Sequence, residues 1–411
     1  MSVIKNIGVV DPACRSIGGH NLTSLCRLKE AMPQQNIVFH VSSSATADVK
    51  RALGNVRLDF NADPYRPAAQ RERRSKRKVL WYLYQFSRLL MGKPFDALNG
   101  EYHLKEMERL FKQYDEADHL VFPTTSVDLL TSILSVIERD KGDRVPSIHM
   151  RFLEYGAEHE KKLVHQAFER LRETLNSNKR VFLYCETDTL KSHLARRHGL
   201  TKISRCILQA PPADNMDIKD YTGCGNFIRI GLLGTPRTDK GFSRLPGIIA
   251  ATMELTHELE IPLKFVVQTT SKSDEYNDQK QGLRKAGFSR TEIEAVPGPL
   301  SERKFAALLA SCDMLLLPYT ARNRERIIGS GLLLDAKINA IPVICPPHDT
   351  LTEFLSVQTG ANAETDEEFA GAIVQIAGNL DRYKSSAQKD AAAFQNLWHS
   401  NALTARLRGE L

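Results

Sequence analysis

The chain has 411 residues, of which 42% are hydrophobic and 26% are charged, a composition typical of a soluble globular protein with two domains. This excludes a disordered or fibrous protein, and the sequence has no apolar run of about 18 to 20 residues that would span a bilayer. The seven cysteines are scattered and form no CxxC pair. They favour reduced thiols in a cytosolic protein over a zinc site or a disulfide framework.

The first half of the chain follows the order strand, glycine loop, helix, strand that is typical of a parallel α/β sheet. It opens with NIGVVD, which we interpret as a strand and not as a signal peptide. The loop PACRSIGGHN and the helical pattern LTSLCRLKEAM follow. Further strands are predicted at NIVFHVSS, 119–125, 145–150 and 181–187, and helices at 127–139, 157–177 and 188–198. We therefore predict a Rossmann-like, acceptor-side domain over 1–210 and, from the prolines of QAPPAD onward, a linker over 211–226.

The net charge of +7 originates in one segment of the first half. Between Arg66 and Lys93 the sequence has nine Lys or Arg and one acid, and the basic run leads into VLWYLYQFSRLLM. Residues 71–91 therefore suit an interfacial helix on an anionic membrane, and they also suit a core helix with a solvated basic end. A single basic patch without a binding module does not favour nucleic acid as a partner.

The same order of elements begins again after the linker. Strands are predicted at FIRIGLLG, PLKFVVQTT, IEAVPG, DMLLLPY and IPVICP, and helices at 241–255, before Gly287, at SERKFAALLASC and at GLLLDAKINA. We predict a second Rossmann-like domain over 227–385 and a C-terminal helix, 386–411, that packs back toward the first domain. Two such domains place a crevice between the carboxyl ends of their sheets, where ligands of these folds usually bind.

Two cations follow the first strand of the second domain. In IGLLGTPRTDKG, residues 230–241, Arg237 and Lys240 lie between Gly234 and Gly241. Positive charge beside glycines at a strand end is typical of a phosphate site, although loop cations are often only solvated surface charge.

The stretch 313–354 carries a second candidate anion site. After the strand DMLLLPY come three arginines (322, 324 and 326), and Gly329, Ser330 and Gly331 then open a helix. A helix start presents unpaired N–H groups and a partial positive charge, Ser330 is a good N-cap, and Asp335 lies where it could accept from a ribose diol. The plain alternatives are a flexible helix entry, a solvated aspartate and a polar arginine loop.

The second half resembles the GT-B glycosyltransferases, family 4 in particular. In that family a helix start with glycine precedes an acidic residue, Ala, and Gly-x-Pro-Val-Ile, and here SGLLLDAKINAIPVI gives Ser330, Gly331, Asp335, Ala336 and the Pro-Val-Ile triplet. The resemblance implies two Rossmann-like domains facing a cleft. It also implies that the donor is held by Gly234, Arg237, Lys240, Gly241, Arg326, Gly329, Ser330, Gly331 and Asp335.

In the first half, IGGHN is similar to the family's acceptor-side loop, with Gly18, Gly19 and His20, although it also reads as an ordinary βα turn. His149, at the end of the strand VPSIHM, matches the histidine near the transferred sugar, although a lone histidine there is often a core residue. The resemblance assigns His149, Arg237 and Lys240 to catalysis, with the two cations in place of a metal, so that neither a metal nor another cofactor is expected.

Two positions depart from the family pattern. The family has two glutamates with seven residues between them; Asp335 stands for the second, the first falls on Ile327, and Glu325 is two residues early. Ala340 replaces the glycine before Ile-Pro-Val.

The resemblance implies a cytoplasmic, retaining hexosyltransferase that uses a nucleotide-diphosphate sugar. The expected acceptor is a glycan or a lipid-linked glycan of surface polysaccharide biosynthesis, reached at the inner face of the membrane. A catalytically silent nucleotide-sugar-binding protein and a GT-B nucleotide-sugar epimerase are the alternatives.

Overall fold

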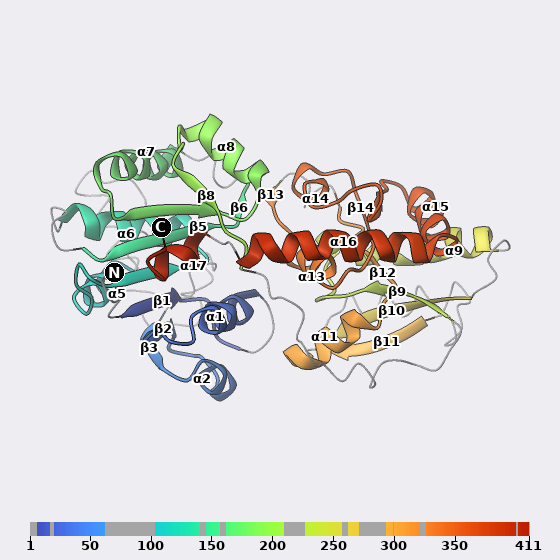
Figure 1. The fold of residues 1–411 in the computed structure, drawn as a ribbon, viewed down its shortest axis with the longest axis horizontal. Helices are drawn as coiled ribbons and strands as arrows, with labels where there is room; N and C mark the ends of the chain where they lie inside the picture. Colours follow the sequence, from blue (N-terminus) through green and yellow to red (C-terminus); the bar gives the residue numbers. More distant parts are fainter. Residues whose placement is uncertain are drawn as a thin grey trace, which may run out of the picture.

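The computed structural model describes residues 6–16, 20–61, 103–139, 145–156, 162–208, 227–256, 262–270, 293–298, 300–320, 326–399 and 402–410. They form two α/β halves, each built on a parallel sheet (Figure 1). The predicted fold class, two Rossmann-like domains, is confirmed. The predicted linker over 211–226, the basic segment 66–93 and the helix before Gly287 lie outside the described residues.

The N-terminal half has a seven-stranded sheet in the order β3-β2-β1-β4-β5-β7-β8, and every neighbouring pair is parallel. Helices cover both faces, so the central strands are buried on both sides and are apolar almost throughout. The strands are β1 (Ile7–Asp11), β2 (Ile37–Ser42), β3 (Val56–Phe60), β4 (His119–Phe122), β5 (Ser147–Phe152), β7 (Val181–Cys185) and β8 (Ile203–Arg205). The helices are α1 (His20–Ala31), α2 (Ala47–Leu53), α5 (Leu104–Phe111), α6 (Val127–Arg139), α7 (Lys162–Ser177) and α8 (Asp188–His198).

The C-terminal half has a six-stranded parallel sheet in the order β11-β10-β9-β12-β14-β15. Its strands are β9 (Ile228–Leu232), β10 (Leu263–Thr270), β11 (Ile293–Gly298), β12 (Met314–Leu316), β14 (Val343–Cys345) and β15 (Gly360–Asn362). Its helices are η3 (Thr238–Lys240), η4 (Phe242–Arg244), α9 (Leu245–Leu255), α11 (Glu302–Ala310), α13 (Gly331–Ile338), α14 (Asp349–Thr352) and α15 (Asp366–Ala377).

The last two helices connect the halves. In Figure 1, α16 (Leu380–His399) lies along the C-terminal half and α17 (Ala402–Leu407) lies on the N-terminal half. Phe394 of α16 is buried in the C-terminal core, whereas Leu403 and Leu407 of α17 are buried in the N-terminal core. The boundary expected at residue 386 falls inside α16, so the chain crosses between the halves later than the sequence indicated.

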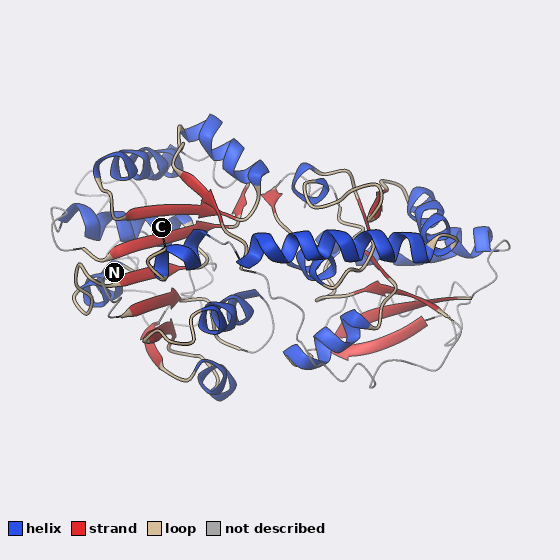
Figure 2. Cartoon of the chain, in the orientation of Figure 1, coloured by secondary structure: helices blue, strands red, loops and turns tan. Residues whose placement is uncertain are grey.

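A two-stranded antiparallel sheet also joins the halves. Strand β6 (Glu154–Tyr155) follows β5, and β13 (Ile327–Ile328) follows β12; Tyr155 pairs with Ile327, and Glu154 with Ile328. In Figure 2 this small sheet lies between the two large ones, beside the ends toward which their strand arrows point. The carboxyl ends of both sheets therefore meet at the boundary between the halves.

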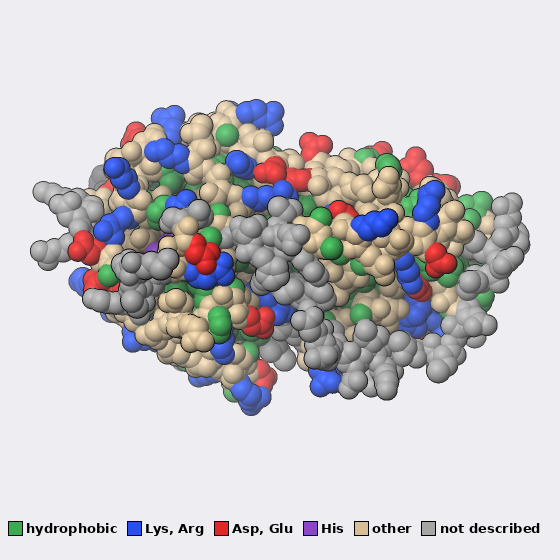
Figure 3. All heavy atoms as spheres, viewed as in Figure 1, with side chains coloured by type: hydrophobic (Ala, Val, Ile, Leu, Met, Phe, Trp, Pro, Cys, Tyr) green, Lys and Arg blue, Asp and Glu red, His purple; other side chains and the backbone are tan. Residues whose placement is uncertain are grey.

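The described residues on one face of the molecule present a surface of mixed charge. On the face shown in Figure 3, Lys and Arg side chains are distributed over both halves and are interspersed with acidic ones. Among the described helices, none combines the length and apolar character that crossing a bilayer requires.

Candidate functional site

The loop after β9 has its backbone fixed by two glycines. Gly234, with a φ of 96°, donates its N–H to Oε1 of Gln268 at 2.8 Å. Gly241, which ends η3, has a φ of 73°, and a Cβ at this position would overlap the carbonyl oxygen of Pro318. A side chain at Gly241 would be strained and would also collide. Only glycine therefore allows this loop, with its two predicted cations, to lie this close to the end of β12.

Lys240 is linked to the start of α13 through a tyrosine. Its Nζ donates to the hydroxyl of Tyr319 at 2.8 Å and lies 4.1 Å from the centroid of that ring. The same hydroxyl is 2.8 Å from Oγ of Ser330. Arg237 is different, because its side chain is 54% exposed and its Nε pairs with Asp239 on the same loop at 3.2 Å. The structure thus brings Lys240, and not Arg237, to Ser330.

Helix α13 begins with an N-cap of the expected kind. Oγ of Ser330 accepts from the N–H of Leu333 at 3.3 Å. The N–H groups of the first helical residues, Gly331 among them, have no partner within the helix, and Gly331 is exposed. Asp335 is half-buried and follows Gly331 by four residues, so that both lie on one side of the helix. An exposed helix start with an ammonium group two hydrogen bonds away is suited to an anion.

Gly329 lies at the contact between the halves. A Cβ at Gly329 would overlap Oε2 of Glu186 and would lie 3.4 Å from Cγ2 of Thr187, both in the segment after β7. Glu186 is buried and pairs with the buried guanidinium of Arg151. The sequence interpretation explained Gly329 by the close approach of the backbone to phosphate. The structure adds a second reason for a residue without a side chain, because the N-terminal half packs directly against this position.

The arginine loop is only partly described. Arg326 pairs with Glu154 of β6, next to the antiparallel pairing of β6 with β13. Residues 321–325, which include the other two arginines and Glu325, lie outside the described residues. Arg326 therefore contacts the N-terminal half, and its predicted contact with the donor stays a prediction.

The sequence suggested that His149 lies at the end of its strand, and the structure shows that it does not. β5 continues for three more residues to Phe152, and His149 is 1% exposed. Its Nε2 is 2.9 Å from Nδ1 of His119, and its Nδ1 is 3.0 Å from the hydroxyl of Tyr184. Burial, with His119 and Arg406 nearby, holds the pKa of His149 well below its ordinary value. This ring belongs to the core of the N-terminal half, and its expected role beside the transferred sugar stays a prediction.

The predicted acceptor-side loop is described only at its end. Gly18 and Gly19 lie outside the described residues, and His20 is the first residue of α1. The role of this loop stays a prediction.

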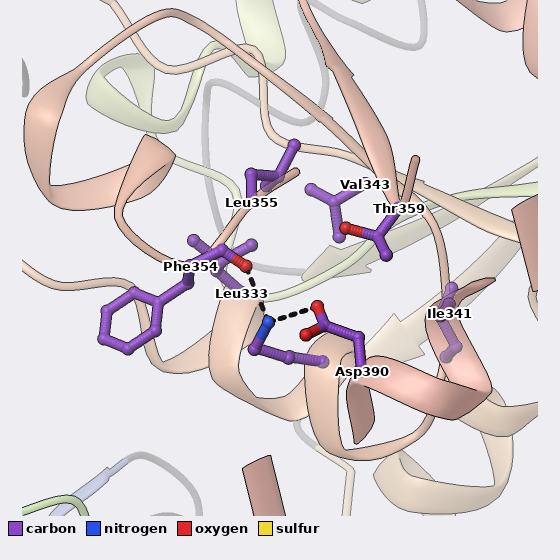
Figure 4. Close-up of a pocket in the computed structure, with 9 residues that line it drawn as sticks. Leu333, Ile341, Val343, Phe354, Leu355, Thr359 and Asp390 are labelled. Carbon is purple, nitrogen blue, oxygen red and sulfur yellow. Dashed lines mark hydrogen bonds and ion pairs between the residues drawn. The ribbon is translucent and has the colours of Figure 1, made fainter. Parts of the chain in front are cut away.

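A small cavity lies on the core side of α13 (Figure 4). Nζ of Lys337 donates there to the carbonyl oxygen of Phe354 at 3.0 Å and to the carboxylate of Asp390 on α16. Because two residues along a helix differ by about 200° in direction, Lys337 and Asp335 lie on nearly opposite sides of α13. This cavity lies between α13 and α16 and is separate from the start of α13, where the candidate anion site lies. It is lined by Leu333, Lys337, Ile341, Val343, Phe354, Leu355, Thr359, Ala387 and Asp390.

Four side chains at the site or at the boundary between the halves were missed by the sequence interpretation: Gln268, Tyr319, Glu186 and Glu353. The first three lie at or just after the carboxyl ends of β10, β12 and β7, a location that could have identified them. Glu353 contacts the start of α8, more than 160 residues away in the chain, and no local pattern indicates such a pair.

Comparison with solved structures identifies the class of fold. The structure of Anabaena Alr3699/HepE in complex with UDP-glucose has a TM-score of 0.64, with 12% identity over 99% of this chain and 100% of that one. A glycosyltransferase from Rickettsia africae has a TM-score of 0.64, with 14% identity over 98% of this chain and 99% of that one. Sucrose-phosphate synthase from Thermosynechococcus elongatus has a TM-score of 0.63, with 11% identity over 98% of both chains.

These matches extend over nearly the whole chain, and the chain has the two-domain GT-B fold. Neither a protein-family model nor a curated protein sequence matches it. Membership of family 4 stays a prediction, since identities this low report the fold alone.

Proposed function

We propose that this chain is a retaining glycosyltransferase of the hexosyltransferase type, which uses a nucleotide-diphosphate sugar and acts on a glycan or lipid-linked acceptor in surface polysaccharide biosynthesis. One observation carries the proposal: the ammonium of Lys240 is linked through Tyr319 to the N-cap of α13, at the carboxyl end of a Rossmann-like sheet. The complexes of Alr3699/HepE with UDP and with UDP-glucose support a donor of this class.

The proposed chemistry is the departure of a nucleoside diphosphate. The acceptor oxygen bonds to the anomeric carbon, the bond from that carbon to the β-phosphate oxygen breaks, and the acceptor proton passes to the leaving phosphate. Lys240, Arg237 and the exposed N–H groups at the start of α13 stabilise the negative charge that grows on this phosphate. These fixed charges take the role of a metal, while Asp335 accepts from the ribose of the donor.

The acceptor is proposed to bind the N-terminal half, near the loop that contains Gly18, Gly19 and His20. Residues 71–91 are proposed to rest on an anionic membrane, because their basic and aromatic composition suits an interfacial helix. Flotation with vesicles tests this: we expect binding to vesicles with phosphatidylserine and none to neutral vesicles. Equal recovery with both kinds would remove the membrane contact.

We expect the protein to bind one of UDP, GDP and ADP in isothermal titration, and Lys240→Ala and Arg237→Ala to lower kcat/KM for transfer. Each substitution should cost about 2 to 4 kcal/mol of transition-state stabilisation, the magnitude typical of a group that stabilises developing charge. Lys202→Ala is the matched control, because Lys202 donates to a backbone carbonyl of the N-terminal half, far from the site.

No binding of any nucleotide at millimolar concentration would end the proposal. Tight nucleotide binding without transfer or hydrolysis would favour the silent binding protein, and donor turnover that needs no acceptor would favour the epimerase. Unchanged turnover in both site variants would remove the roles of Lys240 and Arg237 and leave the nucleotide site intact.

A further inference from the structure

Tyr319 connects the two parts of the anion site. It follows β12 by three residues, its side chain is 4% exposed, and its ring packs in the C-terminal core. Its hydroxyl is 2.8 Å from both Nζ of Lys240 and Oγ of Ser330. The hydroxyl of a core tyrosine thus contacts both a lysine side chain and the N-cap of a helix.

The direction of one hydrogen bond in this group is fixed by chemistry. The ammonium of Lys240 has only protons to give, so the oxygen of Tyr319 accepts from it. The hydroxyls of Tyr319 and Ser330 share a second hydrogen bond, in which either can be the donor, and Oγ of Ser330 also accepts from the N–H of Leu333. The remaining protons of Lys240 are left to bind an anion at the start of α13.

A lysine side chain is a point charge on a flexible four-carbon stem, and ordering it for a ligand costs conformational entropy. Here the stem is restrained twice, by the hydroxyl of Tyr319 and by its ring, over which the ammonium lies at 4.1 Å from the centroid. A group that is already in place before binding contributes more of its interaction energy to affinity.

We propose that Tyr319 is a positioning residue that holds the ammonium of Lys240 at the first turn of α13, where it meets the diphosphate of the donor. This inference rests on the proposed function, because it takes the ligand to be a nucleoside diphosphate. It assigns to Tyr319 no contact with the ligand and no proton transfer, and its effect passes through Lys240 alone.

A double-mutant cycle on nucleotide affinity tests this. The variants are Tyr319→Phe, which keeps the ring and removes the hydroxyl, Lys240→Met, which keeps the length and removes the charge, and the combination of the two. With UDP, GDP and ADP as probes in isothermal titration, we expect Tyr319→Phe to weaken binding of the preferred nucleotide about tenfold, as for the loss of a hydrogen bond to a charged group. In the Lys240→Met background the same change should have no further effect.

Tyr383→Phe is the matched control. Tyr383 is also buried in the C-terminal half, and its hydroxyl accepts from Nε2 of Gln375 at 2.9 Å, away from the site. It should leave nucleotide affinity unchanged.

The outcomes separate the two proposals. If the unaltered protein binds no nucleotide, the proposed function and this inference both fall. If it binds and Tyr319→Phe binds equally well, the inference falls alone. If Tyr319→Phe weakens binding to the same extent with and without Lys240, Tyr319 acts on α13 as a structural residue, and the positioning role is overturned.

Discussion

His149 illustrates how the position of one residue along a strand decides its chemistry. Its ring stacks on that of Phe182 at a centroid distance of 4.9 Å and lies 5.1 Å from the ring of His119. A charged imidazole in this stack would lose its hydration, and a second histidine and Arg406 would repel it. The folded protein therefore requires this residue to be neutral.

We expect the free energy of unfolding to fall as the pH is lowered from 7.5 to 5. The folded-state pKa of His149 lies below its ordinary value of 6.5, so that the unfolded chain binds the proton more readily. The contribution of neutral His149 to the free energy of unfolding is fully present above about pH 6.5. It is lost as the pH falls toward the folded-state pKa, and the free energy of unfolding then changes by at most about 1.4 kcal/mol per pH unit. The pKa of His119 is also lowered by burial and acts in the same direction. Denaturant titrations at a series of pH values measure this.

His149→Phe is the informative variant, because phenylalanine keeps an aromatic ring in the stack and removes the titrating group. It should be less stable at pH 7.5, since Tyr184 loses a hydrogen-bond partner, but its dependence on pH between 5 and 6.5 should be shallower. An unchanged slope would show that His149 does not titrate between the folded and unfolded states.

At the site, the sequence could predict the residues with a local pattern. Lys240 beside Gly241, and Ser330 before a helical run, each follow rules of turns and caps that act over a few residues. Tyr319 follows an apolar strand and reads as one more core residue, because its second contact comes from a loop 79 residues earlier. The strand of His149 was predicted to end at Met150, because the charged Arg151 that follows does not reveal that the strand continues to Phe152.

Among the elements, α8 shows how the boundary between the halves is built. The carboxylate of Glu353 accepts from the N–H of Asp188 at 2.8 Å and from the N–H and Oγ1 of Thr189 at 3.0 Å. Arg205 also donates to it at 2.9 Å. A negative charge at a helix N-terminus is favourable, and here the charge comes from the other half of the molecule.

We expect Glu353→Ala to speed hydrogen exchange at the backbone N–H groups of Asp188 and Thr189 by about tenfold or more, because these groups lose their acceptor. The loss of such a cap typically costs about 0.5 to 2 kcal/mol. Exchange measured by mass spectrometry over the peptides of α8 checks this.

Glu294→Ala is the control for that experiment. Glu294 pairs with Arg229 at 2.9 Å inside the C-terminal half, so its removal deletes an ion pair without touching the boundary. If both variants leave the exchange of α8 unchanged, Glu353 does not cap that helix in solution.

The elements differ in how well the sequence predicts them. Strands such as β1 and β9 are apolar runs bounded by turn residues, and their pattern is local. β8 and β15 have three residues each and lie at sheet edges, where burial imposes little pattern. β6 and β13 are two residues long and pair across more than 170 positions, so only the folded chain reveals them.

At the scale of the whole molecule, the repeated order of strand and helix was enough to predict two Rossmann-like halves. That the carboxyl ends of the two sheets face each other was also predicted. The contacts that join the halves were not predictable, because they link distant residues: Glu186 with Gly329, Glu154 with Arg326, and Glu353 with the start of α8. All three contacts bring a carboxylate to the boundary, and their partners are, in the same order, a glycine, a guanidinium and a helix start.

The pairing of β6 with β13 has a consequence for the proposed donor site. β13 ends at Ile328, two residues before Ser330, so the backbone that bonds to the N-terminal half is continuous with the cap of α13. Moving the halves apart requires the β6–β13 hydrogen bonds to break, and this pulls on the segment that leads into that cap. We therefore expect separation of the halves to disturb the proposed nucleotide site at the start of α13.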